Sequence, residues 1–181
     1  MIDLTRSVLL IQSVPEPWVD YRTMSYFLTK GMPLTNIMVN NTNKSVVESR
    51  NSAIRDMLGR AASGKYDWFI FMDRDHWPTQ DTDEFLSEIE GYDVIGAAYD
   101  VGSKRTWANP DAIHMGTVRV RAEVLTTIQP PWFAFRCSDD GTDITMCECD
   151  YFKHKCQDAG YKVTRRGWTE HDSKHTWKTH H

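Results

Sequence analysis

Short apolar runs alternate with longer amphipathic segments along the first hundred residues. The runs are bounded by polar residues or proline, as is typical of strands buried on both faces of a parallel sheet. Strands are expected at residues 8–12, 36–40, 66–72 and 93–99, and helices at 19–30, 45–62 and 81–90. This alternation predicts an α/β fold, with an open, mostly parallel central sheet flanked by helices.

One helix start is marked by side-chain chemistry. Ser45 precedes the second helical segment, and Glu48 follows three residues later. This is the spacing of a capping box, in which each side chain accepts a hydrogen bond from the other residue's backbone N–H. The sequence therefore predicts that this helix begins directly after Ser45.

The second half of the chain is less regular. It predicts a polar loop at 102–111, a strand at 117–120 and a helix at 122–128, followed by a stop at Pro130-Pro131, a cysteine-rich turn and a helix at 150–159. No internal repeat, low-complexity tract or linker divides the chain. We therefore expect a single domain over residues 1–181.

Composition excludes several classes of protein. The chain is 40% hydrophobic and 25% charged, which is ordinary for a globular protein. No apolar run approaches the roughly 20 residues that a membrane-spanning helix needs, so no membrane span is expected. The N-terminus is interpreted as a first strand and not as a secretory signal, which favours a cytoplasmic location. The net charge of −4 argues against tight, non-specific binding to nucleic acid, which remains possible only as a locally contacted substrate.

Four cysteines lie in the last third of the chain, at Cys137, Cys147, Cys149 and Cys156. A zinc cluster or disulfides must therefore be considered. The spacing contains a C-x-C pair but no C-x-x-C pair of the kind that zinc knuckles use. We expect free thiols, with a zinc-stapled domain as the alternative.

Two carboxylates stand one residue apart, at Asp73 and Asp75, where the strand at 66–72 ends. Holding them close together is costly unless a cation neutralises them. Mg²⁺ and Mn²⁺ prefer oxygen ligands and commonly bridge carboxylates to substrate phosphates. Because ligands of open α/β sheets bind outside the carboxyl ends of strands, this pair is a candidate metal site. The competing interpretation is a pair of turn and helix-cap residues.

Six segments follow one another in the order of a known family. They are VESRNSA at 47–53, WFIFMDRDHWP at 68–78, VIGAAY at 94–99, GTVRVRAEVL at 116–125, PWF at 131–133, and CECDYF at 147–152 with AGY at 159–161. In this order they resemble the GT-A fold glycosyltransferases, especially the small family 2-like enzymes of bacteria, phages and large viruses. The resemblance covers nearly the whole chain.

The resemblance implies a single Rossmann-like GT-A domain. Residues 1–100 would form its nucleotide-binding half and residues 101–181 its acceptor-binding half. The activity would be transfer of a sugar from a nucleotide-sugar, most simply a UDP-sugar, to an acceptor hydroxyl, with Mn²⁺ or Mg²⁺ as cofactor. A saccharide, a glycoconjugate such as a protein glycan, and a modified DNA base are all open as acceptors. For a viral enzyme the location would be the host cytoplasm.

The family's metal and phosphate contacts map onto particular residues. Asp75 would be the main metal-binding carboxylate, with Asp73 contacting the ribose, or the metal through water. Arg50 would help to hold the nucleotide or diphosphate; its alternative is a solvated helix charge. His171 would complete the metal shell, with His175 as second choice, since imidazole is an acceptable ligand for Mn²⁺ beside carboxylates.

Other contacts rest on position along the chain. Ser13, Pro15 and Glu16 follow the first strand, where such enzymes admit the nucleotide base. Trp77, beside the acidic motif, is the expected sugar contact, because sugars stack their C–H faces on aromatic rings.

The catalytic base is expected at Glu148 or Asp150. An inverting transfer needs a carboxylate that removes the proton from the acceptor hydroxyl. The family has adjacent Glu and Asp at this point, whereas this chain has Cys149 where the Asp would fall. Either acid can take the role, and one of them can instead be a helix N-cap.

Two alternatives remain beside the glycosyltransferase. A nucleotidyltransferase-like enzyme also places acids at strand ends, but it normally opens with a glycine-rich, basic phosphate loop, where this chain has SVPEP at 13–17. The other alternative is a non-catalytic binding domain that is stabilised by a zinc ion bound to the C-terminal cysteines. Zinc that survives dialysis would favour the zinc-binding domain, and weak Mn²⁺ binding enhanced by UDP would favour the glycosyltransferase.

Overall fold

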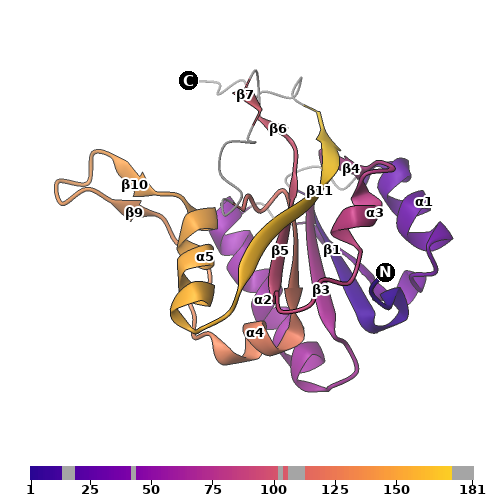
Figure 1. Ribbon diagram of the computed structural model, residues 1–181. Helices are drawn as coiled ribbons and strands as arrows, with labels where there is room; N and C mark the ends of the chain where they lie inside the picture. The colour runs from indigo at the N-terminus through magenta and orange to yellow at the C-terminus, as the bar shows by residue number, and fades with distance from the viewer. Residues whose placement is uncertain (14–18, 42–43, 102–103, 106–112, 173–181) are drawn as a thin grey trace.

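The structure is a computed structural model that describes residues 1–13, 19–41, 44–101, 104–105 and 113–172. Its centre is a seven-stranded sheet in the order β2-β1-β3-β8-β5-β11-β4 (Figure 1). These strands are β1 (Ser7–Ser13), β2 (Ile37–Asn41), β3 (Trp68–Asp73), β4 (His76–Pro78), β5 (Val94–Ala98), β8 (Thr117–Arg121) and β11 (Val163–His171).

The strand directions confirm a mostly parallel α/β sheet. Strand β1 is parallel to both β2 and β3, and β5 is parallel to β11. Strand β8 runs antiparallel between β3 and β5, and β4 runs antiparallel to β11 at the edge. The carboxyl ends of β1, β3, β5 and β11 therefore meet at one edge of the sheet.

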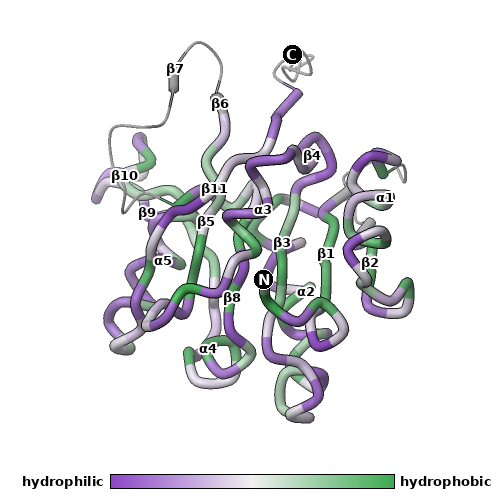
Figure 2. Tube along the Cα trace, turned by 45° about the vertical axis from the view of Figure 1, so that its right-hand side comes forward, coloured by the Kyte–Doolittle hydropathy of each residue, from purple (hydrophilic) through white to green (hydrophobic). Residues whose placement is uncertain are grey.

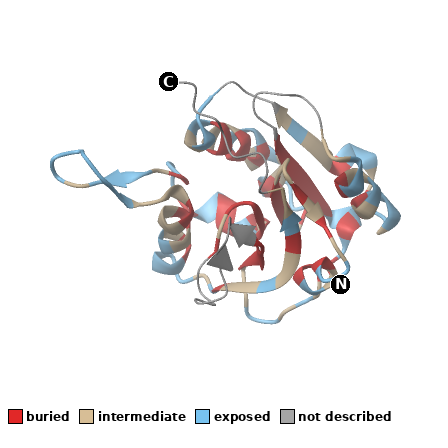
Figure 3. Ribbon diagram, turned by 90° about the horizontal axis from the view of Figure 1, so that it is seen from above, coloured by how far each residue is buried: buried red, intermediate tan, exposed pale blue. Residues whose placement is uncertain are grey.

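Helices cover both faces of the sheet. They are α1 (Tyr21–Thr29), α2 (Val46–Ala62), α3 (Thr82–Phe85), α4 (Ala122–Thr127) and α5 (Glu148–Asp158). Apolar side chains alternate between the faces along each strand. Val8 and Leu10 join the cluster under α2, α4 and α5, and Leu9 and Ile11 join the cluster under α1 and α3. This burial on both faces explains why the central strands are continuously apolar (Figures 2 and 3).

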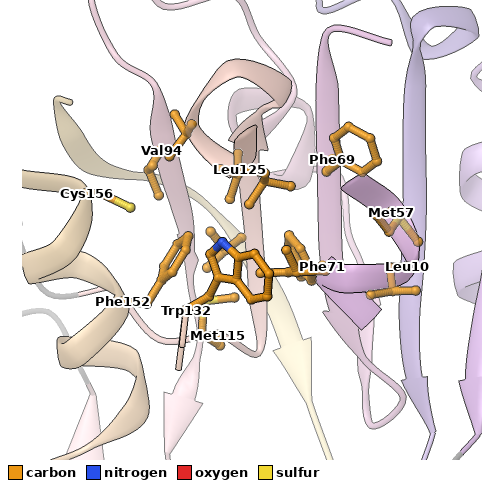
Figure 4. Close-up of a cluster of buried hydrophobic side chains, with 14 of the residues drawn as sticks. Leu10, Met57, Phe69, Phe71, Val94, Met115, Leu125, Trp132, Phe152 and Cys156 are labelled. Carbon is orange, nitrogen blue, oxygen red and sulfur yellow. The ribbon is translucent and has the colours of Figure 1, made fainter. Parts of the chain in front are cut away.

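The larger cluster is closed by residues from the second half of the chain. Trp132 and Phe133 are buried in it, as is Phe152 of α5, whose ring stacks on Phe133 with centroids 4.8 Å apart. Figure 4 shows Trp132 and Phe152 among side chains of β1, β3 and α2. These aromatic residues are core residues.

The predicted start of α2 is confirmed. The side chain of Ser45 accepts a hydrogen bond from the Glu48 backbone N–H at 3.3 Å, and the Glu48 carboxylate accepts one from the Ser45 N–H at 3.2 Å. The helix runs to Ala62, as predicted.

The predicted helix at 81–90 is wrong in length, because α3 contains only Thr82–Phe85. The Ser87 carbonyl, which a longer helix would use internally, accepts a hydrogen bond from the buried Arg119 side chain at 2.6 Å. The Thr82 hydroxyl also binds the backbone of β11, through the Trp168 carbonyl, at 2.6 Å. Tertiary hydrogen bonds thus replace the helical ones.

Several short elements were not predicted. Strands β4 and β11 complete the sheet edge, and β9 (Arg136–Cys137) pairs with β10 (Ile144–Met146) in a hairpin that projects beside α5 (Figure 1). A small ladder joins β6 (Asp100–Val101) to β7 (Lys104–Arg105), and two 3-10 turns, η1 (Leu4–Arg6) and η2 (Leu34–Asn36), precede β1 and β2. Among the described residues, no helix has both the length and the apolar character that crossing a bilayer requires.

Candidate active site

The two acidic residues of the D-x-D motif lie at the carboxyl edge of the sheet. Asp73 is the last residue of β3, and its N–H donates to the Gly116 carbonyl at 2.8 Å. The Arg74 N–H donates to the Gln12 carbonyl at 3.0 Å. The motif is therefore anchored between β1 and the segment that leads into β8. A pocket of about 440 Å³ opens beside it, lined by Gln12, Lys44, Ser45, Val46, Ser49, Asp73, Arg74 and Asp75.

Arg50 joins two of the predicted site residues. It is only 3% exposed, and its guanidinium contacts Asp73 Oδ2 at 3.0 Å and Glu148 Oε1 at 2.8 Å. Burial disfavours the charge of Arg50, but the two carboxylates outweigh it and raise its pKa. Arg50 is thus not a solvated helix charge, and it links the D-x-D motif to the start of α5.

Asp73 is engaged by this arginine. Burial raises the pKa of Asp73, and the neighbouring Asp75 charge acts in the same direction, against the attraction of Arg50. Both of its oxygens lie within 3.2 Å of Arg50 Nη2. The ion-pair partner of Asp75 is instead His171, so the two acids stand in different environments.

The predicted histidine lies beside Asp75. His171 Nε2 is 3.4 Å from Asp75 Oδ2, and the Asp172 N–H donates to the Asp75 carbonyl at 2.9 Å. Burial acts to raise the Asp75 pKa, but the hydrogen bond and electrostatic attraction of His171 outweigh it and lower the pKa. The pairing of β11 with β4 brings His171 here, opposite His76 in the register.

His76 is a site residue that the sequence analysis missed. It is 2% exposed, and its Nδ1 lies 3.3 Å from the Thr169 hydroxyl and 3.4 Å from the Thr117 hydroxyl. Burial lowers its pKa to about 3, so the ring is neutral at physiological pH. Its ring is 4.8 Å from that of His171 between centroids. The available signal was a histidine directly after the D-x-D motif.

Gly116 makes room for the His76 ring. A Cβ atom at this position would lie 2.4 Å from His76 Cε1 and 2.5 Å from Nε2, and 2.8 Å from Cζ of Tyr99. The Tyr99 ring packs edge-on against His76, with centroids 4.2 Å apart. A glycine is required here because any side chain would overlap the imidazole.

The donor atoms fit a divalent cation. One ligand atom each from Asp75, His76 and His171 lies within 4.8 Å of the others. A carboxylate and neutral imidazoles suit Mn²⁺ and related ions. Asp73 is held by Arg50, which agrees with a secondary role for this carboxylate.

The two candidate bases occupy the first turn of α5. Glu148 is bound to Arg50, and its side chain is 14% exposed. Asp150 forms an ion pair with Lys153 at 3.1 Å, and its side chain is 43% exposed. The helix N-cap is Cys147, whose sulfur accepts the Asp150 N–H at 3.5 Å. Neither acid is therefore the N-cap residue.

All four cysteines are free thiols. Among the described residues, the group of possible metal ligands that contains cysteine consists of Cys147, Glu148 and Cys149, without Cys137 or Cys156. Cys137 is exposed on β9 and Cys156 is buried in α5. The four cysteines therefore do not meet as one zinc-binding cluster.

The residues predicted to contact the nucleotide base lie only partly within the described part of the chain. Ser13 ends β1, whereas Pro15, Glu16 and His175 lie outside the described residues. The structure adds Gln12, which lines the pocket and is 8% exposed. Its Oε1 accepts a hydrogen bond from the Ser49 hydroxyl at 2.8 Å, while its Nε2 is buried and has no hydrogen-bond partner among the described residues.

Trp77 is less open to a sugar than the sequence suggested. The Arg22 guanidinium of α1's first turn lies 3.7 Å from the centroid of the indole ring. One stacking surface of Trp77 is therefore occupied by a cation–π contact.

Comparisons with known proteins point to one fold. No family model and no curated protein matches the chain. Among solved structures it is similar to A197 from STIV, at 17% identity and a TM-score of 0.64, over 91% of this chain and 83% of that one. It is also similar to the catalytic domain of Drosophila β1,4-galactosyltransferase 7 in complex with xylobiose, at 18% identity and a TM-score of 0.61, over 92% of this chain and 70% of that one.

A third similar structure is a glycosyltransferase involved in glycosylation of the major capsid protein of PBCV-1, at 11% identity and a TM-score of 0.51, over 88% of this chain and 80% of that one. These likenesses confirm that the chain has the GT-A glycosyltransferase fold, as the sequence resemblance implied. At such identities they establish the fold, and the activity must be argued from the site.

Proposed function

We propose that this protein is a metal-dependent glycosyltransferase that moves a sugar from a nucleotide-sugar to an acceptor hydroxyl. The observation that carries the proposal is the meeting of Asp75, His76 and His171 at the edge of a pocket, with the Arg50–Glu148 pair beside it. Candidate metal ligands, a carboxylate paired with an arginine and a cavity of ligand size thus adjoin one another on a glycosyltransferase fold.

Asp75 and His171 would hold Mn²⁺ or Mg²⁺, with His76 as an additional imidazole. The ion would neutralise charge on the leaving diphosphate when bound. A similar structure, a Drosophila β1,4-galactosyltransferase 7 mutant at 18% identity and a TM-score of 0.53, is a complex with manganese, UDP-galactose and xylobiose. This complex supports a UDP-sugar as donor and a saccharide as acceptor for this chain too.

The nucleotide would occupy the pocket between β1 and the start of α2. Gln12 offers a buried amide N–H₂ there, and Ser13, Pro15 and Glu16 follow it in the chain. An unpaired buried donor is costly, so an acceptor atom from a nucleotide would relieve it. Asp73 lines the same pocket, where a ribose hydroxyl would meet its carboxylate.

Glu148 is our choice of catalytic base. Residues two apart on a helix project about 200° from each other, so Glu148 and Asp150 leave the first turn of α5 on different sides. Glu148 shares the Arg50 guanidinium with Asp73 of the donor site. Its carboxylate would take the proton of the acceptor hydroxyl as that oxygen bonds to the anomeric carbon and the bond from this carbon to the phosphate oxygen breaks.

A screen of nucleotide-sugars tests the proposal. The thermal unfolding temperature and hydrolysis of each donor are measured with and without Mn²⁺, for the wild type and for Asp75→Ala. We expect one donor to stabilise the wild type only when metal is present, and the substitution to remove that effect. The proposal is wrong if no nucleotide diphosphate stabilises the wild type with metal, or if Asp75→Ala leaves the effect intact.

Matched amide substitutions test the base. Glu148→Gln and Asp150→Asn each remove one ionisable oxygen at nearly constant size. We expect Glu148→Gln to lower kcat by about 10²–10⁴-fold with little change in donor affinity, and Asp150→Asn to lower it far less. The opposite ranking would assign the proton transfer to Asp150.

A further inference from the structure

Two thiols and two carboxylates stand together at the start of α5. They belong to four consecutive residues, Cys147, Glu148, Cys149 and Asp150. Cys147 is the N-cap and is half-buried, whereas Cys149 is 8% exposed. One ligand atom each from Cys147, Glu148 and Cys149 lies within 4.8 Å of the other two.

Short contacts run through the whole set. Cys149 Sγ lies 3.6 Å from Glu148 Oε1, and Cys147 Sγ lies 3.4 Å from Asp150 Oδ2. Backbone N–H groups hold both sulfurs in place, that of Met115 on Cys149 at 3.3 Å and that of Asp150 on Cys147 at 3.5 Å. The ligand atoms of Cys147, Glu148 and Cys149 thus lie close together, with both sulfurs fixed by backbone hydrogen bonds.

These distances match the size of a thiophilic cation. Zinc binds sulfur at about 2.3 Å and carboxylate oxygen at about 2.0–2.2 Å, so two ligand atoms of a tetrahedral ion lie about 3.5–3.8 Å apart. The 3.6 Å contact between Cys149 and Glu148 already has this length, and because all three ligand atoms lie within 4.8 Å of one another, small side-chain rotations complete the set. Thiolates favour Zn²⁺ and other soft ions over Mg²⁺ and Mn²⁺, which the Asp75 site would take.

We propose that Cys147, Cys149 and Glu148 form a second metal site, which binds Zn²⁺ or a similar thiophilic ion. This site differs from the Asp75–His171 site in position and in ligand type. It also differs from a four-cysteine staple, because Cys137 and Cys156 take no part.

The second site shares Glu148 with the proposed chemistry. The charge partner of Glu148 in the structure is Arg50, which lies 2.8 Å from its Oε1. A cation bound to Glu148 would take the place of Arg50 as that partner. A metal-bound carboxylate cannot accept the proton of an acceptor hydroxyl. Zinc at this site would therefore inhibit the transfer, and excess Mn²⁺ would not relieve the inhibition. This consequence, unlike the binding itself, rests on the proposed function.

Cadmium titration of the full chain tests the binding directly. Cd²⁺ bound to thiolates produces an ultraviolet charge-transfer band, which is followed without any nucleotide-sugar. The wild type should show the band at one Cd²⁺ per chain and lose it when Zn²⁺ is added. Cys147→Ser and Cys149→Ser should each weaken Cd²⁺ binding at least about tenfold. Cys137→Ser, which changes an exposed thiol away from the site, should leave the affinity for Cd²⁺ unchanged.

The proposal is overturned if the wild type shows no thiolate band, if the band survives in the double variant Cys147→Ser/Cys149→Ser, or if it disappears with Cys137→Ser. Circular dichroism checks the fold of each variant. Because Cys149 is buried and its replacement can destabilise the chain, the half-buried Cys147→Ser variant decides the result if Cys149→Ser does not fold. The ultraviolet band forms without a nucleotide-sugar. A lack of metal binding at this site and a lack of glycosyltransferase activity are therefore observed in separate experiments.

Discussion

Replacing Gly116 by alanine should destabilise the protein through a single methyl group. The added Cβ would lie 2.4 Å from one atom of the His76 ring and 2.5 Å from another, far inside van der Waals contact. The ring is 2% exposed and packed against Tyr99, so it has no free space to enter. Gly116 has no positive φ, so alanine is compatible with the backbone and the cost is purely steric.

The magnitude follows from overpacking. Forcing an extra methyl into a packed interior costs about 1–3 kcal/mol. For a chain of this size, that cost corresponds to a fall in Tm of about 2–12 °C. Because His76 directly follows Asp75, displacement of its ring should also reduce the rise in Tm that Mn²⁺ produces. Both quantities are measured by thermal unfolding with and without metal.

Gly59→Ala is the matched control. Gly59 lies inside α2, and a Cβ there would meet nothing within 4 Å. The same chemical change should therefore stabilise the helix by about 0.5–1 kcal/mol and raise Tm. Combining Gly116→Ala with His76→Ala removes most of the overlap, so the pair should cost less than the sum of the two single changes. If Gly116→Ala is as stable as the wild type, or the two costs simply add, the packing argument is refuted.

Three further predictions concern charged groups. Arg50→Met leaves two carboxylates unpaired and should lower the free energy of unfolding by about 3 kcal/mol in denaturant titrations; adding Glu148→Gln should recover part of the loss. Arg119→Met should raise the free energy of unfolding by about 1 kcal/mol, because two nitrogens of this buried guanidinium have no hydrogen-bond partner in the described part of the chain and burial lowers its pKa to about 10. The hydrogen bonds from Lys30 and Tyr26 lower the pKa of Asp83 in the folded protein. The ionised Asp83 therefore stabilises the fold above its unfolded-state pKa of about 3.9, and this contribution is lost as the pH falls through its folded-state pKa. Asp83→Asn should therefore make Tm fall less steeply in acid. An unchanged acid slope in that variant would contradict the last prediction.

The apolar strands and the start of α2 could be predicted because their signals are local. The runs that form β1, β3 and β5 are apolar on both faces, and Ser45 and Glu48 carry the capping box within four residues. Asp73 follows β3 in the chain, so its place at the sheet edge also followed from the sequence. Such features depend on neighbours a few residues away.

Strand β11 could not be predicted in the same way. Its sequence, VTRRGWTEH, has few apolar residues, and only Val163 and Thr169 are fully buried in it. Its strand state comes from pairing with β5 on one side and β4 on the other. The short α3 has a similar cause, since the buried Arg119 takes the Ser87 carbonyl that a longer helix would need.

Apolar periodicity and helix caps act over a few residues, so local patterns alone indicated which residues end the central strands and which acids stand near the carboxyl edge. The partners of those acids depend instead on the tertiary fold. Arg50 meets Glu148 across 98 residues of chain, and His171 meets Asp75 through the pairing of two strands without an apolar pattern. The burial of His76 against Gly116 has the same origin. Distances between charges depend on where the whole sheet places its strands, which no local pattern encodes.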